Sequence, residues 1–202
     1  GDVLGVVAVR RAAGDPGTGE RLAASEVAAA EVVTELAGGA LRRAQLGERA
    51  ASVAALAGRL AAAVTRADVA DALVEVGGTP LGASMLTCRV LDPTRTSLLT
   101  LARAAVPAEL AEKYDVVPLS SDTPIGDAVR KGRSVWLPDR DAVADAYPHL
   151  VDEVAVAGFG AMAAVPLRST SGEVLGCLAV AWPGAVRLDG LLQGATQTVA
   201  DL

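Results

Sequence analysis

The chain has 202 residues, of which 51% are apolar and only 2% are aromatic, and its formal net charge at pH 7 is −6. This length fits one ordinary domain plus an appendage, and the apolar share suffices for a core built from Ala, Val and Leu. Basic residues cluster at most in pairs such as Arg42-Arg43, so the acidic chain offers no basic face for nucleic acid. No apolar run is long enough to cross a membrane.

The first nine residues reappear near the end of the chain. Residues 1–9 (GDVLGVVAV) align with residues 172–180 (GEVLGCLAV), and an apolar helical segment follows each copy. A repeat at this separation suggests two related domains rather than a short-period solenoid. We therefore expect residues 1–45 to be the final strand and exit helix of a preceding domain, in a fragment of a longer protein.

Residues 22–66 are predicted to be a long helix, because they contain no proline and are rich in Ala, Leu, Glu and Arg. Apolar residues recur along it at heptad spacing, which favours a parallel helix pair between two chains and hence a homodimer. Two alternatives remain open: the helix packs on its own domain, and Gly38-Gly39 divides it in two. The predicted dimer seam consists of Val32, Leu46, Val53, Leu56 and Leu60.

A short helix at 67–76 is followed by two predicted antiparallel strands, 83–91 and 96–105, joined by a turn at Asp92–Arg95. Alternation along the first strand places Leu86 and Cys88 on one face, and Met85, Thr87 and Arg89 on the other. Helical residues 107–113 and a short strand at 116–120 come next.

The segment 123–132 has the features of a short helix with both ends marked. Thr123 is a natural N-cap, Pro124 suits the first helical position, and Gly132 can adopt the left-handed conformation that ends a helix. After it we predict a strand at 133–138, a helical region at 140–157 interrupted near Pro148, strands at 161–168 and 173–182, and a helix at 189–202. The expected fold is α+β, with one antiparallel sheet flanked by helices.

Two segments carry a resemblance to a known family. The hairpin at 164–180 resembles the last two core strands of GAF domains, and residues 118–139 resemble the middle of that domain. The resemblance covers about residues 46–202. It implies that 1–45 end a preceding GAF-like domain, that 46–66 form a linker or signalling helix, and that 67–202 form a GAF domain.

The resemblance also implies a function. GAF domains are non-catalytic sensory and regulatory modules that dimerise through flanking helices and are covalently linked to an output domain. Here we expect a cytoplasmic bacterial, in style actinobacterial, module joined to a histidine kinase or a PP2C-type phosphatase. A ligand-independent dimerisation module is the alternative. The Asn-Lys and Phe of the family's cyclic-nucleotide signature do not occur in residues 181–189.

Little in the sequence indicates catalysis, a metal or a cofactor. His149, the sole histidine, is a remote candidate for a haem ligand, and Cys88 and Cys177 are remote candidates for a thiol-dependent methionine sulfoxide reductase. Both cysteines fall in predicted strands, where buried thiols are the more ordinary interpretation. We therefore predict no catalytic residue, no metal site and no cofactor.

An unknown small-molecule ligand remains possible in a pocket between the sheet and the middle segment. The N–H groups that begin the helix at 124 could bind a carboxylate or a phosphate there. The alternative is that the large side chains simply fill a core that is poor in aromatic residues. The candidate pocket residues are Leu119, Ser121, Thr123, Trp136, Phe159 and Met162.

Overall fold

The structure, a computed structural model, describes residues 24–202. Residues 1–9, with the strand predicted there, lie outside the described residues. Helix α1 (Ala24–Ala62) continues through Gly38-Gly39 without a break. The chain divides into two compact units, one ending at Glu48 and the other spanning Arg49–Leu202.

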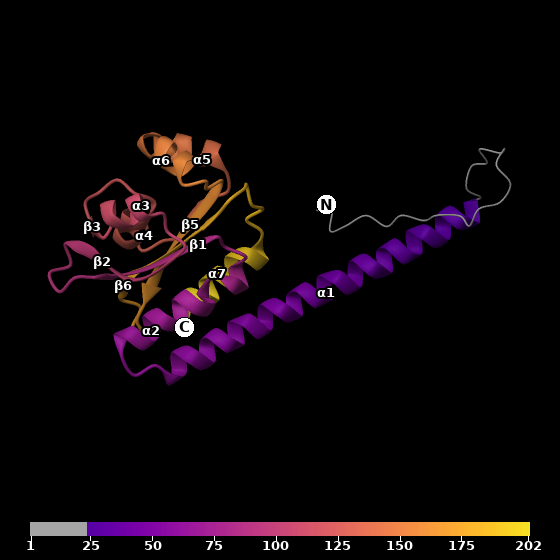
Figure 1. Cartoon of the computed structure of the whole chain (residues 1–202), viewed down its shortest axis with the longest axis horizontal. Helices are drawn as coiled ribbons and strands as arrows, with labels where there is room; N and C mark the ends of the chain where they lie inside the picture. The colour runs from indigo at the N-terminus through magenta and orange to yellow at the C-terminus, as the bar shows by residue number, and fades with distance from the viewer. Residues whose placement is uncertain (1–23) are drawn as a thin grey trace. The chain divides into compact units, whose positions relative to one another are not determined.

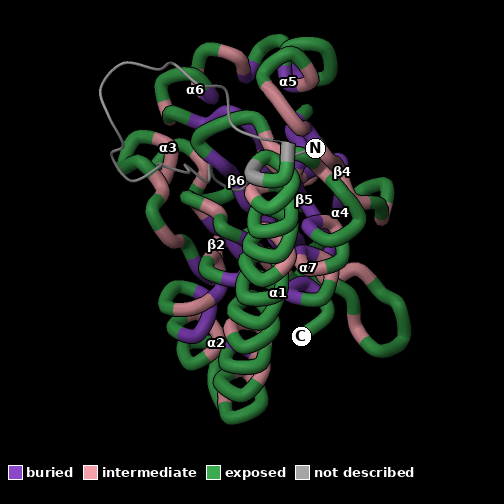
Figure 2. The backbone as a smooth tube through the Cα atoms, turned by 90° about the vertical axis from the view of Figure 1, so that its right-hand side faces the viewer, coloured by how far each residue is buried: buried purple, intermediate pink, exposed green. Residues whose placement is uncertain are grey.

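In the first unit, the described residues 24–48 are helical and most of their side chains are exposed (Figure 2). Several of these exposed side chains are large and apolar, with exposures between 41% and 68%. Exposed apolar side chains favour contact with another surface over contact with water. They are Val27, Val32, Val33, Leu36, Leu41 and Leu46.

The second unit is built on one six-stranded sheet with the order β3-β2-β1-β6-β5-β4, in which every neighbouring pair is antiparallel. The predicted α+β class is therefore confirmed. Two of the predicted strands are shorter in the structure, since only three residues of each pair with the sheet. The strands are β1 (Met85–Leu91), β2 (Ser97–Ala104), β3 (Val116–Pro118), β4 (Val135–Leu137), β5 (Ala161–Arg168) and β6 (Val174–Trp182).

Helices cover both faces of this sheet (Figure 1). One face packs against α2 (Arg66–Ala72), which continues into a π-turn at Leu73–Gly77, and against α7 (Gly190–Asp201). The other face is covered by the middle of the chain. Its helices are α3 (Ala108–Lys113), α4 (Pro124–Lys131), α5 (Arg140–Ala146) and α6 (Val151–Val156).

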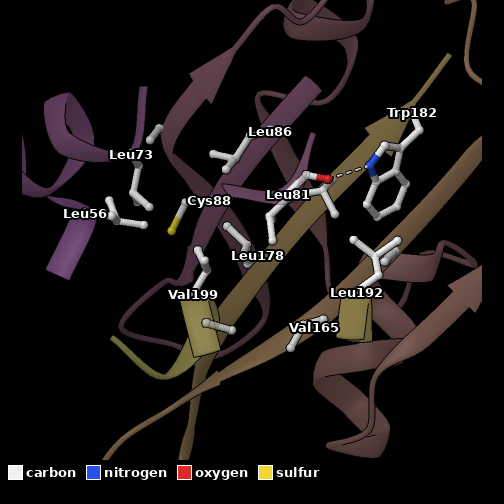
Figure 3. Packing of buried hydrophobic residues seen from close by; sticks show 14 of the residues in the cluster. Leu56, Leu73, Leu81, Leu86, Cys88, Val165, Leu178, Trp182, Leu192 and Val199 are labelled. Atoms are coloured by element: carbon white, nitrogen blue, oxygen red, sulfur yellow. Dashed lines mark hydrogen bonds between the residues drawn. The ribbon is translucent and has the colours of Figure 1, made fainter. Parts of the chain in front are cut away.

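The largest core lies on the α7 face (Figure 3). Leu86 and Cys88 of β1 belong to it, as the alternation predicted, together with Val199 from α7. Leu56 of α1 belongs to the same core and has no exposed surface. Trp182, on β6, is also buried, and its indole N–H donates to the Leu81 carbonyl at 3.0 Å.

A β-bulge interrupts the pairing of β1 with β2. Cys88 lies opposite Ala102, but the next residue, Arg89, lies opposite Thr100, so Leu101 is the extra residue. Leu101 and Ala102 both pack toward the α7 core. A bulge turns the side chains that follow it toward the other face of a strand. Here it places the Thr100 hydroxyl, rather than the Leu101 side chain, beside Arg89.

Helix α4 has the ends that the sequence predicts. The Thr123 hydroxyl accepts the Gly126 N–H at 3.1 Å, and Gly132 has φ 58°. Within the helix, the nearly buried Asp127 carboxylate accepts hydrogen bonds from Arg130, from Lys131 at 2.7 Å and from the Tyr147 hydroxyl at 3.0 Å. These bonds hold the start of α4 in place under α5.

Candidate functional site

A cavity of ≈ 120 Å³ lies between the sheet and the helices α3, α4 and α6. Its floor is formed by β1, β5 and β6, and its far wall by the start of α4 and by α6. Most of the lining is apolar. The large apolar residues around it are Met85, Val106, Leu110, Ile125, Leu150, Val154, Phe159 and Met162.

Arg89 is the one basic residue that lines this cavity among the residues that the structure describes. It is only 5% exposed. Its Nη1 donates to the Thr100 hydroxyl at 2.8 Å and to the Asp115 carbonyl at 3.4 Å. Its Nε has no hydrogen-bond partner among the described residues. Burial lowers the pKa of Arg89 and the nearby Arg103 lowers it further, whereas the nearby Asp115 carboxylate raises it.

Thr87, two residues earlier on β1, is the second polar group of the cavity floor. It is 5% exposed, and within residues 24–202 its hydroxyl has no hydrogen-bond partner. A buried polar group without a partner loses its hydration and gains nothing in exchange. Two such groups on one strand, both facing one cavity, are an exception that requires an explanation.

The carboxylates near the cavity are engaged with other cations. Asp115 pairs with Arg103 at 2.6 Å, and Glu153 pairs with Lys113 and accepts the Tyr114 hydroxyl at 2.6 Å. Although burial raises the pKa of Glu153, the bonds from Lys113 and Tyr114 lower it below its ordinary value. No carboxylate of the described residues forms an ion pair with Arg89.

The structure brings together three of the six candidate pocket residues: Thr123, Phe159 and Met162 line the cavity. Trp136 does not, because β4 turns Val135 and Leu137 toward the cavity side and Trp136 toward the α7 core. Leu119 packs in a small cluster with α4, and Ser121 donates to the Pro118 carbonyl. The prediction for these three residues is therefore corrected.

Arg89 and Thr87 are not among the pocket residues predicted from the sequence. The signal was available, because the alternation along residues 83–91 puts both on the face opposite Leu86 and Cys88. A charged residue in the middle of a strand that is buried on both faces marks either a structural ion pair or a site.

The seam residues divide between the two units. Val32 and Leu46 are 55% and 46% exposed, whereas Val53 is half-buried. Leu56 is fully buried in the core of its own domain, and Leu60 packs against that core. Leu56 is therefore not available to a partner chain. Heptad spacing describes a stripe on a helix and does not distinguish its own domain from a second chain.

The remote catalytic candidates lie elsewhere. His149 is exposed, its Nε2 is 2.8 Å from the Asp122 carbonyl, and it does not line the cavity. Cys88 faces the α7 core and Cys177 faces α4. Burial raises the pKa of Cys88 to about 12 and raises that of Cys177 as well, so both are thiols at neutral pH.

Within residues 24–202, no three His, Cys, Asp or Glu side chains are grouped so that they could hold a metal ion. In the same range, none of the helices combines the length and the apolar character needed to span a bilayer.

A sequence model of the GAF domain matches residues 63–201, more than half of the chain. The chain belongs to the GAF domain family. The match begins beside the end of α1 and runs to the end of α7, so it includes the whole sheet and the cavity. No curated protein matches the chain significantly.

Solved GAF domains share this fold at low identity. The GAF domain of a phosphoenolpyruvate-protein phosphotransferase from Coxiella burnetii is 16% identical, with a TM-score of 0.61 over 76% of this chain and 88% of that one. A methyl-accepting chemotaxis protein, residues 122 to 287, is 19% identical, with a TM-score of 0.57 over 72% and 90%. A phycocyanobilin-bound GAF domain from a cyanobacterial phytochrome is 13% identical, with a TM-score of 0.57 over 75% and 89%. At these identities the likeness shows a shared fold.

Proposed function

We propose that this GAF domain is a non-catalytic sensor that binds a small molecule in the cavity and transmits its occupancy through α1. In this proposal the chain dimerises through α1 and is covalently linked to an output domain, a histidine kinase or a PP2C-type phosphatase. The family supports the sensory role, and the geometry of β1 supports the relay.

The observation that carries the proposal is that one strand serves both the cavity and α1. Thr87 and Arg89 of β1 line the cavity, while Leu86 and Cys88 on its other face lie in the core that holds Leu56 (Figure 3). Strands in a close-packed interior do not deform on one face alone. A ligand that displaces β1 therefore changes the packing around Leu56, and with it the position of the C-terminal end of α1.

Coupling of this kind requires that α1 have two arrangements, and that the domain bind the ligand with a different affinity in each of them. The exposed apolar side chains at Val32 and Leu46 support pairing of α1 with a second copy. A parallel pair would keep both chains' helices in a common direction, as a dimeric output domain needs.

Two alternatives make different predictions. A ligand-independent dimerisation module would dimerise with an empty cavity. A haem sensor would need a ligand in the cavity lining, to which His149 does not belong, and a methionine sulfoxide reductase would need reactive thiols there. The cavity favours the sensor over these alternatives, because its floor carries polar groups that a packing module would not retain.

Native mass spectrometry of the freshly purified chain tests the proposal. We expect a dimer carrying a small-molecule adduct. Ala179, which lines the cavity from β6, should lose the adduct on substitution by leucine, because the larger side chain fills the space. Ala155→Leu is the matched control, since Ala155 is exposed on α6. A dimer without adduct would support the dimerisation module instead, and an absorption spectrum with a Soret band would support haem.

A further inference from the structure

We propose that Arg89 binds the carboxylate of a small monoanionic ligand whose apolar body occupies the cavity. This inference rests on the proposed function, since it names the chemical class of the ligand for that cavity. Four observations carry it: an unpaired buried cation, the edge of the guanidinium that is left free, the bulge that holds it, and the size and charge of the lining.

A buried guanidinium without a counter-ion is unfavourable, because it gives up hydration and receives only neutral acceptors in return. Arg89 is 5% exposed, and its two acceptors, the Thr100 hydroxyl and the Asp115 carbonyl, carry no charge. Neither acceptor depends on Arg89, because the Thr100 hydroxyl itself donates to the Asp115 carbonyl at 2.9 Å. The arginine is therefore not explained by the neighbours it satisfies.

The hydrogen bonds leave one edge of the guanidinium for a ligand. Both bonds come from Nη1, so Nε and Nη2 remain, and Nε has no partner within residues 24–202. These two nitrogens form the edge of arginine that matches the two oxygens of a carboxylate. Nε is covered in the structure, so a ligand reaches it when the guanidinium turns toward the cavity. That turn would draw the side chain away from Thr100 and Asp115, and it gives the site a movement that depends on the ligand.

The bulge in β2 is a specific structural feature that positions the acceptor of Arg89. If the pairing continued regularly after Ala102, Leu101 would lie opposite Arg89, and the guanidinium would meet an alkyl chain instead of a hydroxyl. Bulges occur often beside functional sites because they re-aim one side chain without ending the sheet. The orphaned Thr87 hydroxyl, on the same face of β1, adds a hydrogen bond for a second polar atom of the ligand.

The dimensions and charge of the lining limit the ligand. An engineered apolar cavity of about 150 Å³ accepts benzene, so the ≈ 120 Å³ here suits a single ring or a short branched chain. The described lining holds one cation, Arg89, and one acid, Glu153. A second negative charge on the ligand would find no partner and would be repelled by Glu153. Aromatic and branched aliphatic monocarboxylates fit these limits, and phosphates and dicarboxylates do not.

The chain provides its own probes for a test. It contains two methionines, Met85 and Met162, and both line the cavity. With methyl-¹³C methionine, the full chain gives two methyl resonances that both report on the cavity. We would titrate it with benzoate and isovalerate, and with the neutral isosteres benzamide and isovaleramide.

We expect at least one acid to shift both methyl resonances saturably, with a dissociation constant about tenfold or more below that of its amide. Arg89→Leu should abolish acid binding. Arg89→Lys, which keeps the positive charge but loses the pair of parallel N–H donors, should weaken it. Arg133→Leu, which removes an exposed arginine, should bind as the unaltered chain does. Unshifted methyl resonances in each variant without ligand would show that the cavity is intact.

Amides that bind as well as the acids, or undiminished acid binding in Arg89→Leu, would overturn the inference while leaving a ligand-binding cavity in place. If neither acids nor amides shift the methyl resonances, this inference fails. If native mass spectrometry also shows no adduct, the proposed sensory cavity fails with it.

Discussion

At the scale of single residues, Arg89 differs from every other charged side chain in residues 24–202, because it is nearly buried without forming an ion pair. Asp127 is also nearly buried, but it has Arg130, Lys131 and the Tyr147 hydroxyl as partners. A buried charge with partners, such as Asp127, contributes to the stability of the fold. A buried charge without an ion pair, such as Arg89, costs stability, and proteins tolerate such costs mainly at functional sites.

This contrast leads to a prediction about stability without ligand. Arg89→Leu should leave the free energy of unfolding unchanged or raise it by about 1–2 kcal/mol, because it removes a buried unpaired cation. Urea denaturation followed by circular dichroism measures this. Leu86→Ala on the opposite face of β1 is the control, and should cost about 3 kcal/mol through the cavity it leaves. A comparable loss in Arg89→Leu would mean that the arginine is structural.

The buried thiol of Cys88 predicts a dependence on alkaline pH. Burial raises the pKa of Cys88 in the folded chain to about 12, from an ordinary value of 9.0. Unfolding therefore releases a proton between these values, so the contribution of Cys88 to stability is full below pH 9 and is lost as the pH rises toward 12. The free energy of unfolding should fall less steeply over this range in Cys88→Ala than in the unaltered chain. Parallel slopes in the two proteins would contradict the shift.

At the scale of elements, the local signals in the sequence were reliable where they act through the backbone. Thr123, Pro124 and Gly132 predicted both ends of α4, and alternation predicted the two faces of β1. The same rules failed for Trp136, because a three-residue strand does not reveal from its sequence which face is which. The bulge opposite Arg89 could not be predicted either, since the Thr100-Leu101-Ala102 sequence has no glycine or proline to indicate it.

The cap of α4 gives a prediction at this scale. Thr123→Ala should lower the free energy of unfolding by about 1 kcal/mol, because the Gly126 N–H loses its acceptor. Thr123→Ser keeps a hydroxyl in the same place and should restore most of that loss. Thermal unfolding of the three proteins side by side tests both statements. Equal loss in the alanine and serine variants would show that the methyl group matters and the hydrogen bond does not.

At the scale of the whole molecule, the fold class and the family could be predicted from the sequence, but only part of the cavity lining could. Three of six predicted pocket residues line it, and the polar floor was missed. The reason is physical: the cavity is lined by α3, α4 and α6, which come from one stretch of chain, and by β1 and the β5–β6 hairpin, which come from two others. Periodicity within a segment cannot show which segments will face each other. The seam on α1 has the same limit, since Leu56 packs on its own domain.

The proposed dimer is tested by exposed side chains that the folded domain does not use. Val32→Asp together with Leu46→Asp should dissociate the dimer without unfolding the chain, because both side chains are about half exposed. Light scattering should report a monomer, and circular dichroism an unchanged spectrum. Val156→Asp, which changes an 82% exposed valine on α6, is the control and should remain dimeric. An unaltered chain that is monomeric at tens of micromolar would contradict the proposal.

The bulge in β2 affects how the sequences of related domains are aligned and how this strand can change in evolution. Leu98 and Thr100 face the α4 side, whereas Leu101 and Ala102 both face the α7 side, so the inside-outside pattern of the strand changes phase in its middle. An alignment of relatives that assumes strict alternation would assign half of this strand to the wrong face. Loss of one codon at Leu101 would restore the alternation and leave Thr100 opposite Arg89, because the residues on either side of the bulge would keep their partners on β1. Relatives of this domain can therefore differ by one residue in the length of this strand without any change in what Arg89 faces.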